Sequence, residues 1–347
     1  MTVASCTDKN FIDFCGILLY NHSEREICMK QSIIDILKSG GGYVSGEKIS
    51  QKLGISRAAV WKHIKSLRSE GYDIQSVTNK GYYLAAAPDT ISEYEIKSGL
   101  KTARIGQNMR YVYETDSTNN EAKRFSDMAD GTLFVAEIQT GGKGRLGRQW
   151  VSPAGEGIWM SLLLKPDIIP GEAPEITLIA GLAVCRALKD YGALIKWPND
   201  VVIDGRKICG ILTEMSAEIE RVSYIICGIG INVNTEEFPD ELKETAVSLY
   251  TVTGEKHSRA EIIKRVAEEF EPLYDEYLKY RLKNIIPEYK SACVNIGKRV
   301  SILYGEKETP GTAVDITENG HLVVDTDEGR VTISSGEVSV RGVYGYV

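Results

Sequence analysis

A short glycine-rich segment carries the strongest chemical signal in the chain. Residues 141–150 read GGKGRLGRQW and contain four glycines and three cations. Backbone N–H groups in such a loop can wrap an anion, and guanidinium groups can grip it with paired hydrogen bonds. The composition predicts a loop that orders around a phosphate or carboxylate, with a flexible surface loop as the alternative. It is not a Walker loop, because Lys143 is followed by Gly144 and not by Ser or Thr.

A second segment, KWPND at residues 196–200, places polar side chains beside a proline. Pro198 is expected to end a strand and to leave Lys196 and Asn199 where open α/β sheets bind ligands. The pair Asp204-Gly205 predicts a two-residue hairpin, which puts Lys207 just past the turn.

The third segment is GIGIN at residues 228–232. It resembles a dinucleotide fingerprint only superficially, because no helix follows it. Close approach of the backbone to a ligand, at Gly230 for example, is the preferred interpretation.

The first two segments supply five cations to a body that is otherwise acidic, since residues 88–347 carry 30 Lys/Arg against 40 Asp/Glu. These cations are Lys143, Arg145, Arg148, Lys196 and Lys207. Cations concentrated in an acidic body indicate a site for phosphate, carboxylate or both. If a carboxylate must attack the α-phosphate of a nucleotide, a dense positive clamp and Mg²⁺ are needed.

Other chemistries find little support. The four histidines have no spacing typical of a Ser/His/Asp arrangement, so a covalent enzyme intermediate is not expected. Seven cysteines without a Cys-x-x-Cys motif argue against a disulfide framework and against a zinc site, and no protein-held metal is predicted.

A basic module precedes the acidic body. Residues 29–87 hold nine Lys/Arg against four Asp/Glu, which is typical of a domain that binds a polyanion. Helices are predicted over Gln31–Ser39, Gly46–Leu53 and Arg57–Glu70, with Ser56 as the N-cap of the third. In the third helix Val60, Ile64 and Leu67 form an apolar stripe.

The segments Tyr72–Val77 and Tyr82–Leu84 follow as a predicted β-hairpin. Together these elements predict a winged helix-turn-helix that binds DNA, with a charged three-helix bundle as the alternative. The residues expected to contact DNA are Ser56, Arg57, Lys62, Lys65 and Lys80.

The body alternates between predicted strands and helices. The strands are Thr132–Ile138, Ile158–Leu164, Leu194–Trp197, Asp200–Ile203, Lys207–Met215 and Arg221–Ile229, and the helices are Asn119–Met128, Glu175–Tyr191 and Arg259–Tyr280. Short strands between glycines follow from Val294 onward. The fold class is therefore α+β, with no transmembrane segment and no secretion signal, and a cytoplasmic location is expected.

At these segments the sequence resembles biotin protein ligases of the bifunctional type that also represses the biotin operon. The resemblance rests on residues 142–150, on residues 196–200 and on Ser117-Thr118-Asn119, and it extends from about Lys30 to the end of the sequence. Lys143 departs from the arginine often found at its position. Lysine keeps the charge but loses the bidentate fork.

The resemblance implies a two-step reaction. Biotin and MgATP give biotinyl-5′-AMP and pyrophosphate, and a lysine of a biotin carboxyl carrier protein then attacks the mixed anhydride. The implied biotin-binding residues are Ser117, Thr118, Asn119, Gln139, Gly142, Lys143, Arg145, Lys207 and Gly230. The implied nucleotide-binding residues are Arg148, Trp150, Lys196, Asn199 and Asn232. The implied catalytic side chains are Arg145, Lys196 and Lys207.

The resemblance also implies a domain plan. Residues 1–28 are an extension of unknown role, and residues 29–87 are the winged helix-turn-helix domain. Residues 88–291 are a class II synthetase-like ligase domain with a central mixed β-sheet and helices, and residues 292–347 are an SH3-like β-barrel.

In this family the adenylate promotes a homodimer that spans operator DNA, and no membrane partner is expected. Two alternatives remain at this point: a lipoate ligase, and a ligand-sensing repressor without ligase activity.

Overall fold

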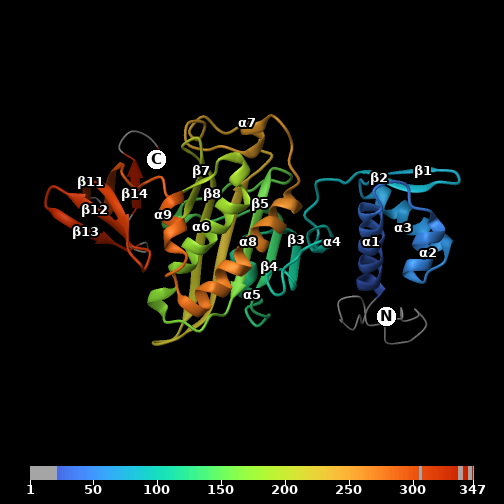
Figure 1. The fold of residues 1–347 in the computed structure, drawn as a ribbon, viewed down its shortest axis with the longest axis horizontal. Helices are drawn as coiled ribbons and strands as arrows, with labels where there is room; N and C mark the ends of the chain where they lie inside the picture. The colour runs from blue at the N-terminus through green and yellow to red at the C-terminus, as the bar shows by residue number, and fades with distance from the viewer. Residues whose placement is uncertain (1–21, 305–306, 335–338, 343–345, 347) are drawn as a thin grey trace. The chain divides into compact units, whose positions relative to one another are not determined.

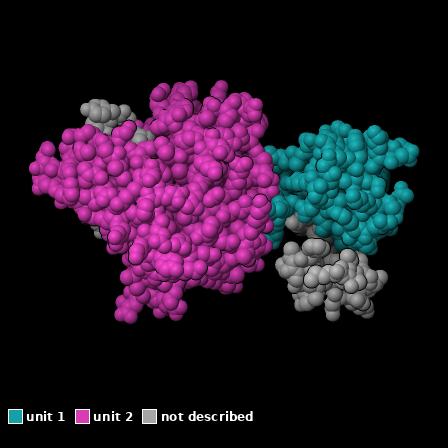
Figure 2. Space-filling view, in the orientation of Figure 1, with its two compact units in different colours: residues 1–99 teal, residues 100–347 magenta. Residues whose placement is uncertain are grey.

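The computed structural model describes residues 22–304, 307–334, 339–342 and 346 (Figure 1). Most of the predicted N-terminal extension, residues 1–21, lies outside the described residues. By its internal contacts the chain divides into two compact units, residues 1–99 and 100–347 (Figure 2).

The first unit is a three-helix domain with a two-stranded wing. Its elements are α1 (His22–Ser39), α2 (Gly46–Leu53), α3 (Arg57–Ser69), β1 (Asp73–Val77), β2 (Gly81–Ala86) and α4 (Glu93–Lys97). The predicted stripe of Val60, Ile64 and Leu67 is buried in its core. Ser56 caps α3 by accepting a hydrogen bond from the Ala59 N–H, at 3.1 Å.

The first helix differs from the prediction, since α1 begins at His22 and not at Gln31. Charge pairs support the longer helix, because Lys30 Nζ lies 3.5 Å from Glu26 Oε1 one turn earlier and 2.6 Å from Glu70 Oε1. The sequence around Met29 offers no N-cap, and the pattern of apolar residues does not mark where the helix starts. The start of α1 is therefore not predictable from these local signals.

The second unit is built on a seven-stranded sheet in the order β3-β4-β5-β9-β8-β7-β6. Only β3 and β4 pair in parallel, so the sheet is mixed as expected. Its strands are β3 (Met109–Thr115), β4 (Thr132–Gln139), β5 (Gly157–Leu164), β6 (Leu194–Lys196), β7 (Asp200–Ile203), β8 (Arg206–Ala217) and β9 (Val222–Asn232). The edge strand β3 was not among the predicted strands.

The second unit also contains helices. They are α5 (Thr118–Arg124), α6 (Glu175–Ala187), α7 (Leu249–Thr253), α8 (Arg259–Tyr280) and α9 (Ile286–Ala292), with 3₁₀ turns at Arg145–Gly147, Pro170–Glu172 and Lys189–Tyr191. Figure 1 shows the long helices α6 and α8 side by side across the sheet. Thr177 of α6 is hydrogen-bonded to Thr213 of β8, whereas Asn119 of α5 is hydrogen-bonded to Glu214, the next residue of that strand. Since successive side chains of a strand point to opposite faces, α5 and α6 lie on opposite sides of the sheet.

The C-terminal strands form a five-stranded antiparallel sheet in the order β13-β12-β11-β10-β14. The strands are β10 (Arg299–Tyr304), β11 (Lys307–Ile316), β12 (Leu322–Thr326), β13 (Gly329–Ile333) and β14 (Ser339–Gly342). The sheet is anchored to the body at Trp197, whose indole Nε1 donates to Gly320 O at 3.0 Å and whose backbone N–H donates to Asn295 Oδ1 at 2.7 Å. The described strands therefore make an open sheet, with β13 and β14 at its edges.

Candidate functional site

A cavity opens on the α5 side of the large sheet. Several parts of the chain build it: the start of α5, the segment 139–150, the strands β5, β8 and β9, and Asn199 between β6 and β7. Its lining residues are Ser117, Thr118, Asn119, Gln139, Lys143, Gly144, Arg145, Trp150, Trp159, Met160, Asn199, Lys207, Gly210, Ile211, Leu212, Gly228, Ile229 and Gly230.

Glycines form the floor of this cavity. The register of β8 and β9 places Gly210 opposite Gly230, and β5 and β9 pair Trp159 with Gly230. The Trp150 ring lies over both glycines, since a Cβ atom would come within 2.8 Å of it at Gly210 and within 2.7 Å at Gly230. The Trp150 Nε1 is buried and has no hydrogen-bond partner among the described residues, so it is a donor available to a ligand.

Polar groups line the wall at the start of α5. The Gln139 Oε1 accepts from the Thr118 N–H at 2.8 Å, and the Gln139 Nε2 donates to Ser152 Oγ at 2.8 Å. The Ser161 hydroxyl, fully buried on β5, lies 2.7 Å from Thr118 Oγ1 and 2.6 Å from Asn119 Oδ1. This network fixes Thr118 and Gln139 at the cavity, where they offer both donors and acceptors.

Asn119 is held from the other side by Glu214, since its Nδ2 donates to Glu214 Oε2 at 2.8 Å. Lys123 Nζ lies 2.6 Å from the other oxygen of that carboxylate. Burial raises the pKa of Glu214, but the hydrogen bonds from Lys123 and Asn119 outweigh it and lower the pKa below its ordinary value. Glu214 is therefore an ionised anchor for Asn119 at neutral pH.

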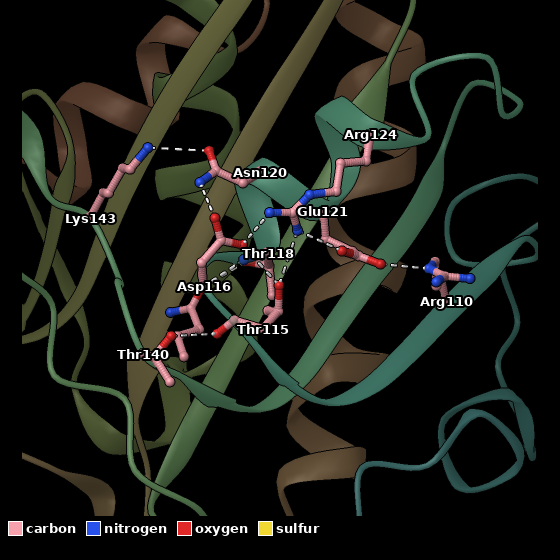
Figure 3. Close-up of polar contacts among 10 residues, drawn as sticks. Arg110, Thr115, Asp116, Thr118, Asn120, Glu121, Arg124, Thr140 and Lys143 are labelled. Carbon is pink, nitrogen blue, oxygen red and sulfur yellow. Dashed lines mark hydrogen bonds and ion pairs between the residues drawn. The ribbon is translucent and has the colours of Figure 1, made fainter.

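A polar network ties the glycine-rich segment to the first turns of α5 (Figure 3). Lys143 Nζ donates to Asn120 Oδ1 at 3.2 Å, and Asn120 Nδ2 donates to Asp116 Oδ2 at 2.6 Å. Arg124 pairs with the other oxygen of Asp116 at 2.8 Å. Burial raises the pKa of Asp116, but the hydrogen bonds from Asn120 and Arg124 hold it well below its ordinary range. Lys143 is therefore aligned by a series of hydrogen bonds that ends on a carboxylate ionised at neutral pH.

Two more cations are oriented by the segment that follows β6. Arg145 Nη1 donates to Asn199 Oδ1 at 2.8 Å, and Lys207 Nζ lies 2.6 Å from Asp200 Oδ1. Burial lowers the pKa of Arg145, whereas Asp200 raises it. The guanidinium group nevertheless stays charged at neutral pH, because an arginine is not deprotonated in a protein. The arrangement concentrates positive charge at one end of the cavity.

The cavity brings together most of the residues predicted for a ligand site. Those lining it are Ser117, Thr118, Asn119, Gln139, Lys143, Arg145, Trp150, Asn199, Lys207 and Gly230. Four others are not among the lining residues: Gly142, Arg148, Lys196 and Asn232. Arg148 is exposed, and Lys196 is buried against Tyr346, with Nζ 3.4 Å from the ring centroid.

The other two residues have structural partners. A Cβ at Gly142 would collide with the Trp150 carbonyl oxygen, so that this glycine is required where the loop closes on itself. Asn232 Nδ2 donates to Val247 O at 3.2 Å.

Sequence reasoning missed Ser161, Glu214 and Tyr346. Ser161 and Glu214 lie within apolar strand patterns, where alternation with their neighbours is the only available signal. Tyr346 follows the C-terminal sheet, far from Lys196 in the sequence, and no local pattern links the two residues.

The first unit presents its predicted DNA-contacting residues to solvent. Arg57, Lys62, Lys65 and Lys80 are exposed. Trp61, which was not predicted, is 55% exposed on the same helix, and Lys65 Nζ lies 5.5 Å from its ring centroid. Lys65 and Trp61 are therefore neighbours on an exposed part of α3.

Within the described part of the chain no helix is long and apolar enough to cross a membrane. The described His, Cys, Asp and Glu side chains form no group of three or more that could hold a metal ion.

Three family models match the chain. The Biotin/lipoate A/B protein ligase family covers residues 110–232, an HTH domain model covers residues 30–83, and the Biotin protein ligase C terminal domain covers residues 296–341. Among solved structures, the biotin protein ligase from Aquifex aeolicus in complex with biotin and ATP is similar at 35% identity, with a TM-score of 0.61. That comparison covers 68% of this chain and 99% of the other.

Curated relatives agree with these models. The bifunctional ligase/repressor BirA of Bacillus subtilis is 41% identical over 320 residues, which cover 90% of this chain and 98% of that protein. The biotin--[acetyl-CoA-carboxylase] ligase of Mycobacterium tuberculosis is 32% identical over 263 residues, which cover 72% of this chain and 95% of that protein. The chain is therefore a member of the biotin protein ligase family, in its bifunctional ligase/repressor branch.

Proposed function

We propose that the chain joins biotin to ATP as biotinyl-5′-AMP and then transfers the biotinyl group to a lysine of a biotin carboxyl carrier protein. The observation that carries this proposal is the cavity itself, in which a polar wall, apolar strands and oriented cations meet. It fits a molecule with a ureido ring, an apolar chain and a carboxylate. The class II synthetase-like assignment of the body and the SH3-like assignment of the C-terminal sheet belong to this proposal.

In the first step a carboxylate oxygen of biotin attacks the α-phosphorus of ATP, and the bond to the β-phosphate oxygen breaks to release pyrophosphate. Two anions must approach each other, which is favourable only inside a positively charged clamp. Lys207, paired with Asp200, would orient the biotin carboxylate, and Arg145, held by Asn199, would contact both biotin and the phosphate. Arg148 and Lys196 are proposed for the phosphates as well.

In the second step the carrier lysine attacks the carbonyl carbon, and AMP leaves. The amine is the nucleophile, so the protein's task is to position the anhydride and exclude water from it. The segment 141–150 is suited to that task, since Trp150 N donates to Gly142 O at 2.9 Å and Gly144 N donates to Arg148 O at 2.7 Å. These bonds close the loop on itself beside the cavity.

We include Mg²⁺ in this proposal as a partner of ATP. The carboxylate beside the clamp, Asp200, is already contacted by Lys207, Asn199 and Tyr346. The described carboxylates therefore do not build a metal cage, and the phosphates of ATP are the natural ligands for Mg²⁺. Bound there, the ion would neutralise charge on the phosphates.

The test measures pyrophosphate release by the purified chain with MgATP and biotin, and then with MgATP and lipoate. Turnover with biotin and its absence with lipoate supports the proposal. Turnover with lipoate alone would favour a lipoate ligase, and turnover with neither would leave a ligand-sensing repressor. Mass analysis of a carrier domain then checks for a single biotinylated lysine.

A second role, repression through operator DNA, is favoured by the exposed cations of α3 and the wing. We propose that Ser56, Arg57, Lys62, Lys65 and Lys80 contact DNA and that the adenylate promotes a dimer whose two basic domains bind two half-sites. Gel shifts with biotin-gene promoter DNA, with and without biotin and ATP, test this role.

A further inference from the structure

Tyr346, which follows the C-terminal sheet, reaches the cluster of charges beside the cavity. Its ring lies against Lys196, whose Nζ is 3.4 Å from the ring centroid. Its hydroxyl donates to Asp200 Oδ2 at 2.5 Å. One side chain thus contacts both charged residues of the KWPND segment.

Asp200 is the centre of this cluster. Its Oδ1 lies 2.6 Å from Lys207 Nζ and accepts from Asn199 Nδ2 at 3.1 Å. Asn199 in turn accepts the hydrogen bond from Arg145. Because Asp200 Oδ2 accepts the hydrogen bond from Tyr346, Asp200 Oδ1 faces the residues that line the cavity. Burial and the charge of Asp200 raise the pKa of Tyr346 far above its ordinary value, so that the phenol remains a donor.

Lys196 is only 5% exposed, and a buried ammonium group requires compensation. The negative face of an aromatic ring attracts an ammonium group but adds no formal charge beside it. The tyrosine ring therefore contributes to holding Lys196 in place without adding a negative charge of its own.

We propose that Tyr346 is a positioning residue for the nucleotide half of the reaction: its ring holds Lys196, and its hydroxyl holds Asp200 in the orientation that aligns Asn199. This inference rests on the proposed biotin-activating function and assigns to it a residue from outside the ligase fold. Tyr346 acts through its neighbours and not on the reacting atoms.

The experiment compares Tyr346→Leu and Tyr346→Phe with the wild-type chain by steady-state pyrophosphate release. Tyr280→Leu, an exposed position on α8, is the matched control. Tyr346→Leu is expected to raise the KM for ATP about tenfold, the scale of a desolvated cation–π contact. Tyr346→Phe keeps the ring, so its KM for ATP is expected to rise by no more than about threefold. Tyr280→Leu is expected to match wild type.

Biotin affinity, measured by calorimetry without ATP, separates positioning from general damage. The proposal requires the Leu variant to bind biotin within about twofold of wild type and to unfold at the same temperature. It is overturned if the Leu variant keeps the wild-type KM for ATP, or if ATP and biotin binding weaken together with a lower Tm. It is also overturned if Phe is as harmful as Leu.

The two proposals fail in different ways. A wild-type chain that releases no pyrophosphate with biotin removes the proposed function and this inference with it. An active wild-type chain with an equally active Tyr346→Leu variant removes only the role of Tyr346.

Discussion

Arg145 and Asn199 are joined by a hydrogen bond of 2.8 Å between the guanidinium Nη1 and the amide Oδ1. The bond connects the glycine-rich segment to the KWPND segment, so the two strongest motifs of the sequence form one structural site. Both residues line the cavity. The bond also gives the loop a second fixed contact, in addition to the one between Lys143 and Asn120.

Replacing Arg145 with glycine should release the reactive adenylate early. The variant loses the bond to Asn199 and the guanidinium group that we propose for the phosphate. A charge-assisted contact of this kind is worth roughly 10- to 100-fold in adenylate retention. The measurement is biotin incorporation into a lysine-rich bystander protein after addition of biotin and ATP. Arg221→Gly, an exposed arginine, serves as the control. Equal retention of the adenylate by Arg145→Gly and wild type would contradict the proposed role.

Gly230→Ala should displace Trp150. The added Cβ would lie 2.7 Å from the indole ring, whereas Gly171→Ala meets no atom within 4 Å and is the matched control. We expect the Gly230 variant to bind the nucleotide roughly tenfold more weakly and to lose about 1–3 kcal/mol of unfolding free energy from overpacking. Tryptophan fluorescence reports the ring movement, and calorimetry reports the affinity. Unchanged fluorescence and affinity would show that the ring is not constrained by the glycine.

The buried pair of Arg259 and Glu137 should be important for stability. Arg259 is 2% exposed, and its Nη1 lies 2.8 Å from Glu137 Oε1. Arg259→Ala leaves a buried carboxylate without this partner and is expected to cost about 3–5 kcal/mol of unfolding free energy. Arg265→Ala, on the same helix but in an exposed pair with Asp190, should cost under about 1 kcal/mol. Urea unfolding compares the two, and similar losses would refute the argument.

Glu175 should make the second unit less stable as the pH rises. Burial is the main cause that raises its pKa from 4.5 to about 7. Well below pH 4.5 the carboxyl is protonated in both folded and unfolded chains, so its ionisation has no effect on stability. Between 4.5 and 7 the unfolded state loses the proton first, and above 7 the full penalty remains.

Glu175→Gln should therefore stabilise the protein at pH 8 by roughly 1–2 kcal/mol, after allowance for partial solvent screening, and have little effect at about pH 4. Urea unfolding at the two pH values measures this difference. The exposed Glu241→Gln is the control. If Glu175→Gln gives the same gain at both pH values, the cause is something other than ionisation.

Alanine at Lys62 or Lys65 should weaken DNA binding and flatten its salt dependence. Each lost phosphate contact lowers the slope of log K against log salt by about 1. Titrations at several salt concentrations measure the slope. Lys97→Ala, on α4 and paired with Glu93, is the control. If the salt slope of DNA binding by the Lys62 and Lys65 variants equals that of wild type, these side chains do not contact the phosphate backbone of DNA.

Local patterns predicted most of the elements that build the site. The hairpin at Asp204-Gly205 is present, with Asp204 at φ 50° and Gly205 at φ 72°, because those two residue types tolerate positive φ. The strands β4 and β5 match their predicted ranges to within a residue. Helix Arg259–Tyr280 matches the prediction at both ends, since Ser258 supplies the N-cap.

What the sequence could not predict depends on long-range packing. The edge strand β3 is recognisable only by its parallel partner β4, since five of its seven residues are exposed or only partly buried. Ser161 belongs to a strand buried on every residue, so its role beside Thr118 appears only once α5 is placed. The grouping of Arg145 with Asn199 was expected from composition, whereas their direct bond was not.

The contact between Trp197 and Gly320 limits which C-terminal sheets can replace the one in this chain. The indole is 1% exposed and bonded to the C-terminal sheet, and Gly320 at φ 77° has no room for a side chain beside Leu178. A chain cut before residue 292 would expose that indole to water and leave the KWPND turn without its outer support. Chimaeras that graft a C-terminal sheet from a distant relative should therefore be productive only when the donor brings a glycine at this position.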